Sequence, residues 1–270
     1  TRSRRFKQRR NKRNTTMTEM NPGDVEFSIF PKPQLLVGRG KVTESIVEDL
    51  NTMCDDMLAD PETPSYADKL VGEIHKGSQL EVDTMDKRFK KFKKLLKDAT
   101  NIYINHYFES IGNTPIPYHL EVDDVWTVHQ FEGDYNPLHD HGSEHFSAFA
   151  GFIHTKVPSQ IIDRENLKPE SIYGAQGAMD GVTSLVWGDV GNRDRVIFKF
   201  PQTEFIVPEV GVFYLFPLWL NHVVYPFRGE GERRSISYNI NVIWDDDYYE
   251  NPIPSKVSLK TSIEERIKNG

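Results

Sequence analysis

Three histidines occupy positions from which their imidazoles could bind one metal ion. His139 and His141 lie two residues apart in the run from Gly133 to His141, and His222 follows the apolar run from Gly211 to Phe216. Residues i and i+2 of a β-strand point to the same face, so the first two rings can share an ion. A third imidazole from a distant strand would complete a facial site with open positions for a substrate. We therefore predict a metal site at these three histidines.

A strand with two chemically different faces follows His222. It opens at Arg233, and beyond Arg234 polar residues alternate with apolar ones, as Ser235, Ile236, Ser237, Tyr238, Asn239 and Ile240. This period of two indicates a strand with one polar and one apolar face. Such a strand is either an edge that faces water or the wall of a polar pocket. Its position soon after His222 favours the pocket wall.

The elements that would hold these residues fall into a helical half and a strand-rich half. Apolar residues recur at helical spacing from Thr43 to Leu58 and from Phe89 to Tyr107, which predicts two amphipathic helices. Residues 24–40 are typical of a first strand and turn. After Pro117, runs rich in β-branched and aromatic residues predict strands at 119–131, 146–157, 182–187, 195–200, 204–207, 211–216, 222–227 and 234–244. Many short strands indicate a sandwich or barrel.

This order of elements predicts a mainly β fold with N-terminal helices (α+β) in a single domain. We place the domain at residues 24–244, with helical support at 41–112 and a β core at 118–244. Residues 1–23 and 245–270 are then tails. The polar stretch 159–181 is expected to be a long loop, and we predict that it covers a bound substrate.

Composition excludes several classes of protein. The chain has 16 Phe, 11 Tyr and 4 Trp, enough bulky side chains for a sizeable core, so it is not mostly disordered. No window approaches the roughly 18 consecutive apolar residues of a membrane-spanning helix, so we expect no membrane partner. The single cysteine, Cys54, cannot form an internal disulfide, and residues 1–10 lack the apolar core of a secretion signal. We therefore predict a cytoplasmic protein.

The charge is unevenly distributed along the chain. The net charge is −7, yet eight of the 33 basic residues fall within the first 13 positions, and without them it is −15. An acidic body argues against a nucleic-acid-binding domain, so nucleic acid is expected as a partner only through the basic tail. The tail could equally be a solvated arm, or an extension that is not native, because Met17 begins a plausible protein start.

Six runs in order along the chain carry a family resemblance. They are Phe30-Pro31, Glu132 to His141, Gly151 to Pro158, Gly211 to Pro217, His222 to Pro226 and Arg233 to Asn239. Over about residues 24–244 the chain resembles the 2-oxoglutarate and iron(II)-dependent oxygenases of prolyl-hydroxylase-like type, particularly members found in marine phages and bacteria. The resemblance implies a double-stranded β-helix, which is a jelly-roll or cupin-like fold. It also implies a phage-encoded enzyme that acts in the host cytoplasm.

The resemblance further implies iron(II) and 2-oxoglutarate as cofactors, with ascorbate as an accessory reductant. The implied reaction is hydroxylation of a C–H bond in an unidentified small molecule or peptide. By position, the metal ligands correspond to His139, His141 and His222. Most such enzymes have Asp or Glu where His141 stands, so the ligands here would be three neutral imidazoles unless Asp140 or Glu144 contributes. An all-histidine site leaves the metal charge uncompensated and should favour anionic co-ligands.

The cofactor-binding residues are carried over in the same way. The arginine that binds the far carboxylate of 2-oxoglutarate corresponds to Arg233, and its planar guanidinium suits bidentate contact with a carboxylate. Ser235 shares its strand face, whereas Arg234 should point away. A tyrosine that often helps to hold the same carboxylate corresponds to His154.

Two other hypotheses fit parts of the same sequence. Gly133, His139, His141, Glu144 and Gly151 nearly reproduce the first cupin motif, which would make Glu144 a metal ligand. The second cupin motif fits less well, because Trp219 and Pro226 stand where Gly and Asn are expected. The other hypothesis is a phage-associated jelly-roll protein that has a structural or binding role and no catalytic one.

Overall fold

Two antiparallel sheets and two long helices build the part of the chain that this computed structural model describes, residues 17–20, 25–32, 35–122, 124–142, 147–163, 179–188 and 202–244. The helices are α1 (Glu44–Ala59), α2 (Lys90–Ser110) and the short α3 (Ser159–Ile162), with a 3-10 turn, η1, at Ala67–Lys69. The strands are β1 (Met17–Met20), β2 (Val25–Lys32), β3 (Leu35–Val42), β4 (Ser78–Glu81), β5 (Tyr118–Glu121), β6 (Val125–Gln130), β7 (Asn136–His139), β8 (Ser147–Lys156), β9 (Thr183–Val186), β10 (Thr203–Ile206), β11 (Val212–Pro217), β12 (Asn221–Val224) and β13 (Arg233–Trp244). The prediction of a mainly β protein is confirmed.

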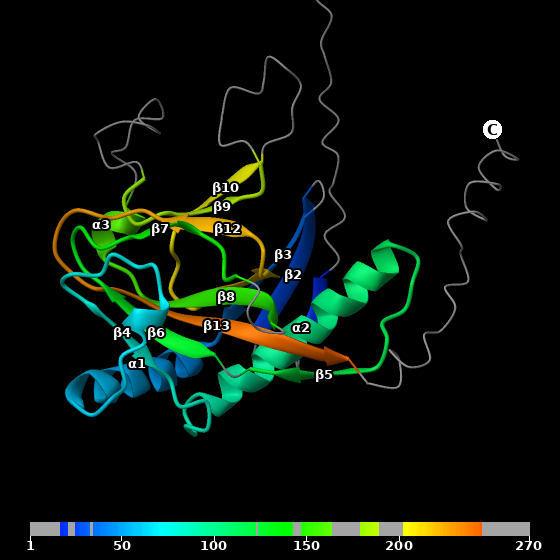
Figure 1. Ribbon diagram of the computed structural model, residues 1–270, viewed down its shortest axis with the longest axis horizontal. Coiled ribbons are helices and arrows are strands. Elements are labelled where there is room, and N and C mark those ends of the chain that lie inside the picture. The colour runs from blue at the N-terminus through cyan, green and yellow to red at the C-terminus, as the bar shows by residue number, and fades with distance from the viewer. Residues whose placement is uncertain are drawn as a thin grey trace, which may run out of the picture.

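The elements form three layers. The larger sheet has the strand order β1-β2-β3-β11-β8-β13-β6-β4, with β5 also paired to β13, and the smaller sheet has the order β10-β9-β12-β7. Figure 1 shows the small sheet on one side of β8 and β13, and helices α1 and α2 on the other. The large sheet therefore separates the helices from the small sheet.

Helices α1 and α2 bury their apolar faces against the large sheet. The main core cluster unites Leu50 and Met53 of α1, Phe92 and Leu96 of α2, and Ile236 of β13. Each of these five side chains is removed almost completely from water, which is the chief source of stability for an amphipathic helix. Two residues of the predicted helix patterns lie outside this core, because Leu58 at the end of α1 is 45% exposed and Tyr107 of α2 is 47% exposed.

A second core cluster lies between the two sheets. Its buried residues come from β3, β8 and β11 of the large sheet, from β9 and β10 of the small sheet, and from the turn between β11 and β12. They are Leu35, Val37, Ala150, Phe152, Phe216, Leu185, Ile206, Leu218 and Leu220. These contacts hold the sheets face to face and leave room for polar groups at one end.

The structure departs from the predicted strands in several places. Residues 17–20 were expected to belong to the tail, yet β1 pairs with β2 and extends the large sheet. The predicted strand 119–131 is two strands, β5 and β6, because each pairs with a different stretch of β13. Strands β4 and β7 were not among the predicted strands.

Several predicted segments lie partly or wholly outside the described residues. The strand 195–200 and residues 1–16 and 245–270 are among them. The predicted loop 159–181 begins with α3, and residues 164–178 lie outside the description. Within the described part of the chain, no helix combines the length and apolar character needed to cross a membrane.

Candidate metal and 2-oxoglutarate site

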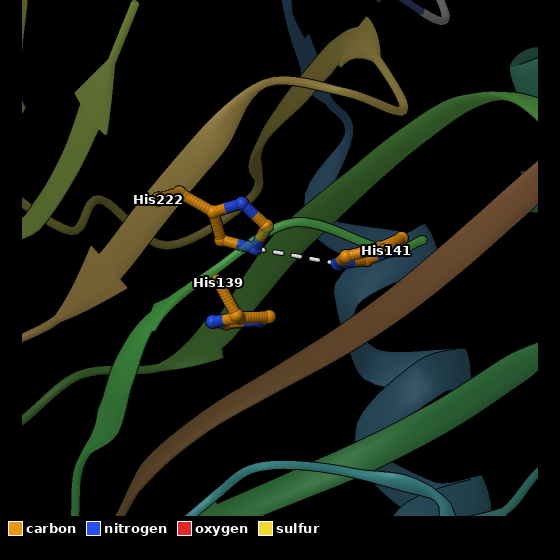
Figure 2. Close-up of side chains that lie close together, drawn as sticks. All are labelled: His139, His141 and His222. Carbon is orange, nitrogen blue, oxygen red and sulfur yellow. Dashed lines mark hydrogen bonds between the residues drawn. The ribbon is translucent and has the colours of Figure 1, made fainter. Parts of the chain in front are cut away.

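The three predicted histidines come together between the sheets. His139 ends β7 and pairs directly with His222 of the neighbouring β12. His141 lies two residues beyond the end of β7, where its backbone N–H donates to the carbonyl oxygen of Leu218 at 3.3 Å. One ring nitrogen from each histidine lies within 4.8 Å of those from the other two. Figure 2 shows the three rings converging, two from the end of β7 and the residues after it and one from β12.

Backbone carbonyls set the protonation of two of these rings. The Nδ1 of His139 lies 2.7 Å from the oxygen of Pro137, and that of His222 lies 3.0 Å from the oxygen of Leu220. A carbonyl oxygen only accepts, so each Nδ1 carries a proton and donates it. In the neutral imidazole, Nε2 then has a free lone pair, which is the form of histidine that binds metals.

Asn239 positions the third ring in the same way. Its Oδ1 lies 2.6 Å from Nδ1 of His141 and accepts a hydrogen bond from the N–H at that position. Asn239 belongs to the polar face of β13, so the large sheet orients a ring whose backbone is held next to the small sheet. The sequence had indicated Asn239 only as a polar residue of that face. Its contact with His141 depends on the distance between the two sheets, which no local pattern reports.

Burial keeps all three imidazoles neutral near pH 7. Loss of solvation lowers the pKa of His139, lowers that of His141 to about 4, and lowers that of His222 well below its usual value. Each ring therefore presents an unprotonated Nε2. The Nε2 atoms of His141 and His222 are only 3.3 Å apart, with both lone pairs on the inner side of the cluster.

This donor set fits a divalent transition metal. Two nitrogen ligands bound to one ion at about 2.1 Å, at angles between octahedral and tetrahedral, lie roughly 3.0 to 3.4 Å apart. The separation of the two Nε2 atoms, 3.3 Å, falls in that interval. Three lone pairs without a proton among them are mutually repulsive, and a cation would remove that repulsion. The site therefore has the ligand type and tautomers that a metal requires, and the His141–His222 pair also has the required spacing.

The two alternative carboxylate ligands do not join the described cluster. The side chain of Asp140 is exposed, and its Oδ1 accepts a hydrogen bond from the N–H of Gly142 at 2.9 Å. Glu144, the ligand of the cupin hypothesis, lies outside the described residues. The metal donors that the described chain brings together are thus imidazoles alone.

Because these histidines are buried in the neutral form, we expect acid to lower the stability of the metal-free protein. Below about pH 6.5 the unfolded chain takes up protons at these positions, whereas the folded chain resists them until the lowered pKa values are reached. The free energy of unfolding should therefore fall between pH 6.5 and 5, by about 1.4 kcal/mol per pH unit for each histidine involved. Urea titrations at pH 7, 6 and 5 measure it.

A matched pair of variants tests whether the buried histidines cause this pH dependence of stability. His222→Asn should make the pH dependence shallower by about one proton, while His75→Asn, at a side chain that is 76% exposed, should leave it unchanged. Equal stability of the wild-type protein at pH 7 and pH 5 would contradict the prediction.

Arg233 is a buried cation without an acidic partner among the described residues. It is 2% exposed, and its guanidinium donates to Oε1 of Gln130, to Nε2 of His154 at 2.8 Å and to Oγ1 of Thr183 at 3.0 Å. Its Nε has no hydrogen-bond partner there. Burial lowers the pKa of Arg233 to about 10, still far above neutral pH. A charge held in this way is costly unless an anion arrives to offset it.

Arg234 has the opposite environment. Its side chain points to the helix side of the sheet, where it contacts Glu232 at 2.7 Å and Asp55 of α1 at 2.6 Å. Burial alone would lower its pKa, but the hydrogen bonds to these two carboxylates raise it. Burial likewise opposes ionisation of Glu232, yet hydrogen bonds from His129 and Arg234 lower its pKa to about 2. Arg234 therefore attaches α1 to the sheet, and the alternation of β13 separates the two arginines as expected.

His154 of β8 and Ser235 of β13 face each other across the strand pair that holds Arg233. Ser235 lines the pocket that contains the three histidines and Arg233, as the shared strand face indicated. His154, opposite Ser235 in the β8–β13 pairing, is fully buried behind Arg233 and is not one of the pocket-lining residues. It accepts a hydrogen bond from Arg233, and burial holds its pKa well below the usual value. Its place is therefore that of a support for the arginine.

Residues that the sequence did not indicate complete the pocket. Gln130 of β6 accepts from Arg233 and donates from Nε2 to Oδ1 of Asn136 at 3.0 Å, which connects the arginine to the strand of His139. Trp126 lines the pocket 5.6 Å from the ring of His141. Leu70 and Val71, from the segment after η1, form an apolar wall beside it. The run Val125–Gln130 does not alternate between polar and apolar residues, so no local pattern marked Gln130 as a pocket residue.

Comparison with known proteins identifies the relatives of this site. Residues 124–239 match the model of a family described as "Putative 2OG-Fe(II) oxygenase". The matched region contains the three histidines and Arg233. The resemblance drawn from the sequence is confirmed over these residues, and with it the prediction of an enzyme. No curated protein has a sequence that matches this chain.

Several solved structures are similar to the chain at low sequence identity. A prolyl-4-hydroxylase from Pseudomonas putida is 12% identical, with 74% of this chain and 88% of that chain covered and a TM-score of 0.46. HygX from Streptomyces hygroscopicus, solved with nickel and 2-oxoglutarate, is 13% identical, with 80% and 82% covered and a TM-score of 0.45. AviO1 from Streptomyces viridochromogenes Tue57 is 11% identical, with 83% and 91% covered and a TM-score of 0.47.

Proposed function

We propose that this chain, whose residues 124–239 match the 2OG-Fe(II) oxygenase family, is a 2-oxoglutarate and iron(II)-dependent dioxygenase that hydroxylates a C–H bond. In this proposal His139, His141 and His222 hold the iron, and Arg233 binds the far carboxylate of 2-oxoglutarate. The two facing sheets correspond to a double-stranded β-helix. The observation that carries the proposal is that one pocket contains three converging, neutral imidazoles and a buried arginine that has no acidic partner among the described residues.

The metal would supply the redox chemistry when bound, using oxygen and the electrons released by decarboxylation of 2-oxoglutarate. The chain's own residues prepare the ligands for it. Pro137, Leu220 and Asn239 each accept a hydrogen bond from the Nδ1–H of one histidine. This bond orients the ring and keeps Nε2 available. No ring has to turn or lose a proton near pH 7 before the metal enters.

Arg233 would bind and orient 2-oxoglutarate. A carboxylate that meets the guanidinium replaces neutral acceptors with a charge-assisted pair, which offsets the cost of burying the cation. Gln130, Thr183 and His154 hold the guanidinium before the ligand arrives, so little rotamer entropy remains to be lost. Ser235, on the same strand face, is a further hydroxyl at this end of the pocket.

The apolar residues of the pocket would exclude water from the reaction. Trp126 and Phe152 line it from the large sheet, and Leu70 and Val71 line it from the segment after η1. Tyr66 stacks on Trp126 with ring centroids 5.3 Å apart and so attaches that segment to the sheet. A pocket enclosed in this way strengthens the interaction of Arg233 with a carboxylate.

Anaerobic titration tests the proposal. Metal-free protein is loaded with iron(II), and 2-oxoglutarate is then added while the visible absorption is recorded. We expect an iron(II)-to-2-oxoglutarate charge-transfer band at one equivalent of each, followed on admission of oxygen by succinate formation, with ascorbate present to keep the iron reduced. Absence of both the band and succinate, in protein that is folded and loaded with iron, would overturn the proposed function.

A further inference from the structure

The pocket that holds the three histidines has no acidic side chain among its described lining residues. Its polar groups are neutral amides, hydroxyls and imidazoles, together with the cation Arg233. The nearest carboxylate along the chain, Asp140, is exposed and bonded to the N–H of Gly142. Its charge is therefore screened by water in a way that a pocket carboxylate would not be.

The charge balance of the loaded site follows from these residues. A divalent metal on three neutral imidazoles carries two positive charges, and Arg233 adds a third. The two carboxylates of 2-oxoglutarate neutralise two of the three. A site with two histidines and one carboxylate would be neutral at the same stage, whereas this one retains one positive charge in a poorly solvated space.

The pocket also has a preferred place for an apolar body. Leu70, Val71 and Trp126 line the pocket together, and Trp126 of β6 is the direct cross-strand neighbour of Ser237 on β13. Val71 is 48% exposed, although it is a large aliphatic side chain at the pocket. An exposed aliphatic group at a pocket wall is suited to contact with an apolar part of a ligand.

From these two features we propose that the primary substrate is a monocarboxylic acid. Its carboxylate would neutralise the remaining positive charge, and its hydrocarbon part would pack on Leu70, Val71 and Trp126. This proposal rests on the proposed function, because the charge count assumes a bound metal and 2-oxoglutarate. It narrows the substrate from any small molecule or peptide to an acid with an apolar body.

Binding of matched probes to the cobalt(II) protein tests the proposal without turnover. Cobalt(II) is added to the full chain, 2-oxoglutarate is brought to saturation without oxygen, and the visible cobalt bands and calorimetry report binding of a second ligand. Butyrate and butyramide have nearly the same shape and differ in charge. We expect butyrate to bind at least tenfold more tightly than butyramide, and each methylene from acetate to butyrate to add up to roughly fourfold.

Three variants separate charge from shape. His141→Asp adds a negative charge within the ligand set and should reduce the preference for butyrate to twofold or less. Asp140→Asn changes the charge by one unit at the neighbouring exposed position, so the preference should stay within twofold of wild type. Val71→Ser should reduce the gain from acetate to butyrate while leaving acetate binding unchanged. Cobalt content and urea titrations confirm that each variant is folded and loaded.

The possible failures are distinguishable. If neither cobalt(II) nor 2-oxoglutarate binds, the proposed function fails, and this inference fails with it. If both bind and butyrate is no better than butyramide, the inference is overturned while the proposed function stands. If chloride or acetate binds as well as butyrate, the site accepts an inorganic or minimal anion, and the assignment of an apolar acid as substrate is overturned.

Discussion

Replacing Arg233 by methionine should abolish 2-oxoglutarate binding without destabilising the metal-free protein. The substitution removes a buried cation that no described carboxylate neutralises, so the fold loses little and is relieved of a desolvation cost. Affinity for 2-oxoglutarate should fall at least a hundredfold, which corresponds to about 2.7 kcal/mol and lies within the range for truncating one partner of a buried ion pair. Calorimetry on the cobalt(II) protein and urea titration measure the two effects.

Replacement of the neighbouring Arg234 is the control. It should lower the stability of the protein and leave 2-oxoglutarate affinity nearly unchanged. Arg234→Met removes the cation that pairs with both Glu232 and Asp55 in the interface between α1 and the sheet, and should lower the free energy of unfolding by roughly 3 to 5 kcal/mol. Under conditions where this variant remains folded, 2-oxoglutarate affinity should change less than threefold. Equal loss of stability in both variants would mean that Arg233 is a structural residue, and its assignment to 2-oxoglutarate would be withdrawn.

Metal should stabilise the wild-type protein strongly, and His222→Ala should remove that effect. A ligand that binds only the folded state, at a free concentration a thousand times its dissociation constant, raises the free energy of unfolding by about 4 kcal/mol. Nickel(II) or cobalt(II) should therefore raise the urea midpoint, and chelation with EDTA should reverse the change. His222→Ala removes one of the three converging nitrogens, so the shift should fall below about 1 kcal/mol at the same metal concentration.

The exposed histidine His75 serves as the control for this measurement. Its ring lies 3.4 Å from Glu73 on the surface and contacts none of the three candidate ligands in the described chain. His75→Ala should keep the full stabilisation by metal. If it reduces the shift as much as His222→Ala does, the metal binds at the surface, and the assignment of the buried triad is wrong.

Local periodicity was enough to predict both long helices and most of the strands that surround the site. The alternation from Arg233 to Asn239 predicted which side chains face the pocket, because in a strand the direction of each side chain follows from its position along the chain. In the structure Arg233, Ser235 and Asn239 lie on the histidine side, while Arg234 and Ile236 lie on the helix side. The helical spacing in 43–58 and 89–107 similarly predicted the faces of α1 and α2 that are buried.

The composition of the pocket depended on contacts between distant segments. His222 lies beside His139 because β12 pairs with β7. His141, beyond the end of β7, is oriented toward them by the hydrogen bond that its Nδ1–H donates to Asn239 of the other sheet. Short strands such as β4, and the apolar wall at Leu70 and Val71, have no local periodicity to predict them. A side chain's direction along its own element is encoded by near neighbours, whereas the partner it meets is selected by the packing of whole sheets, a balance of many weak contacts spread over the chain.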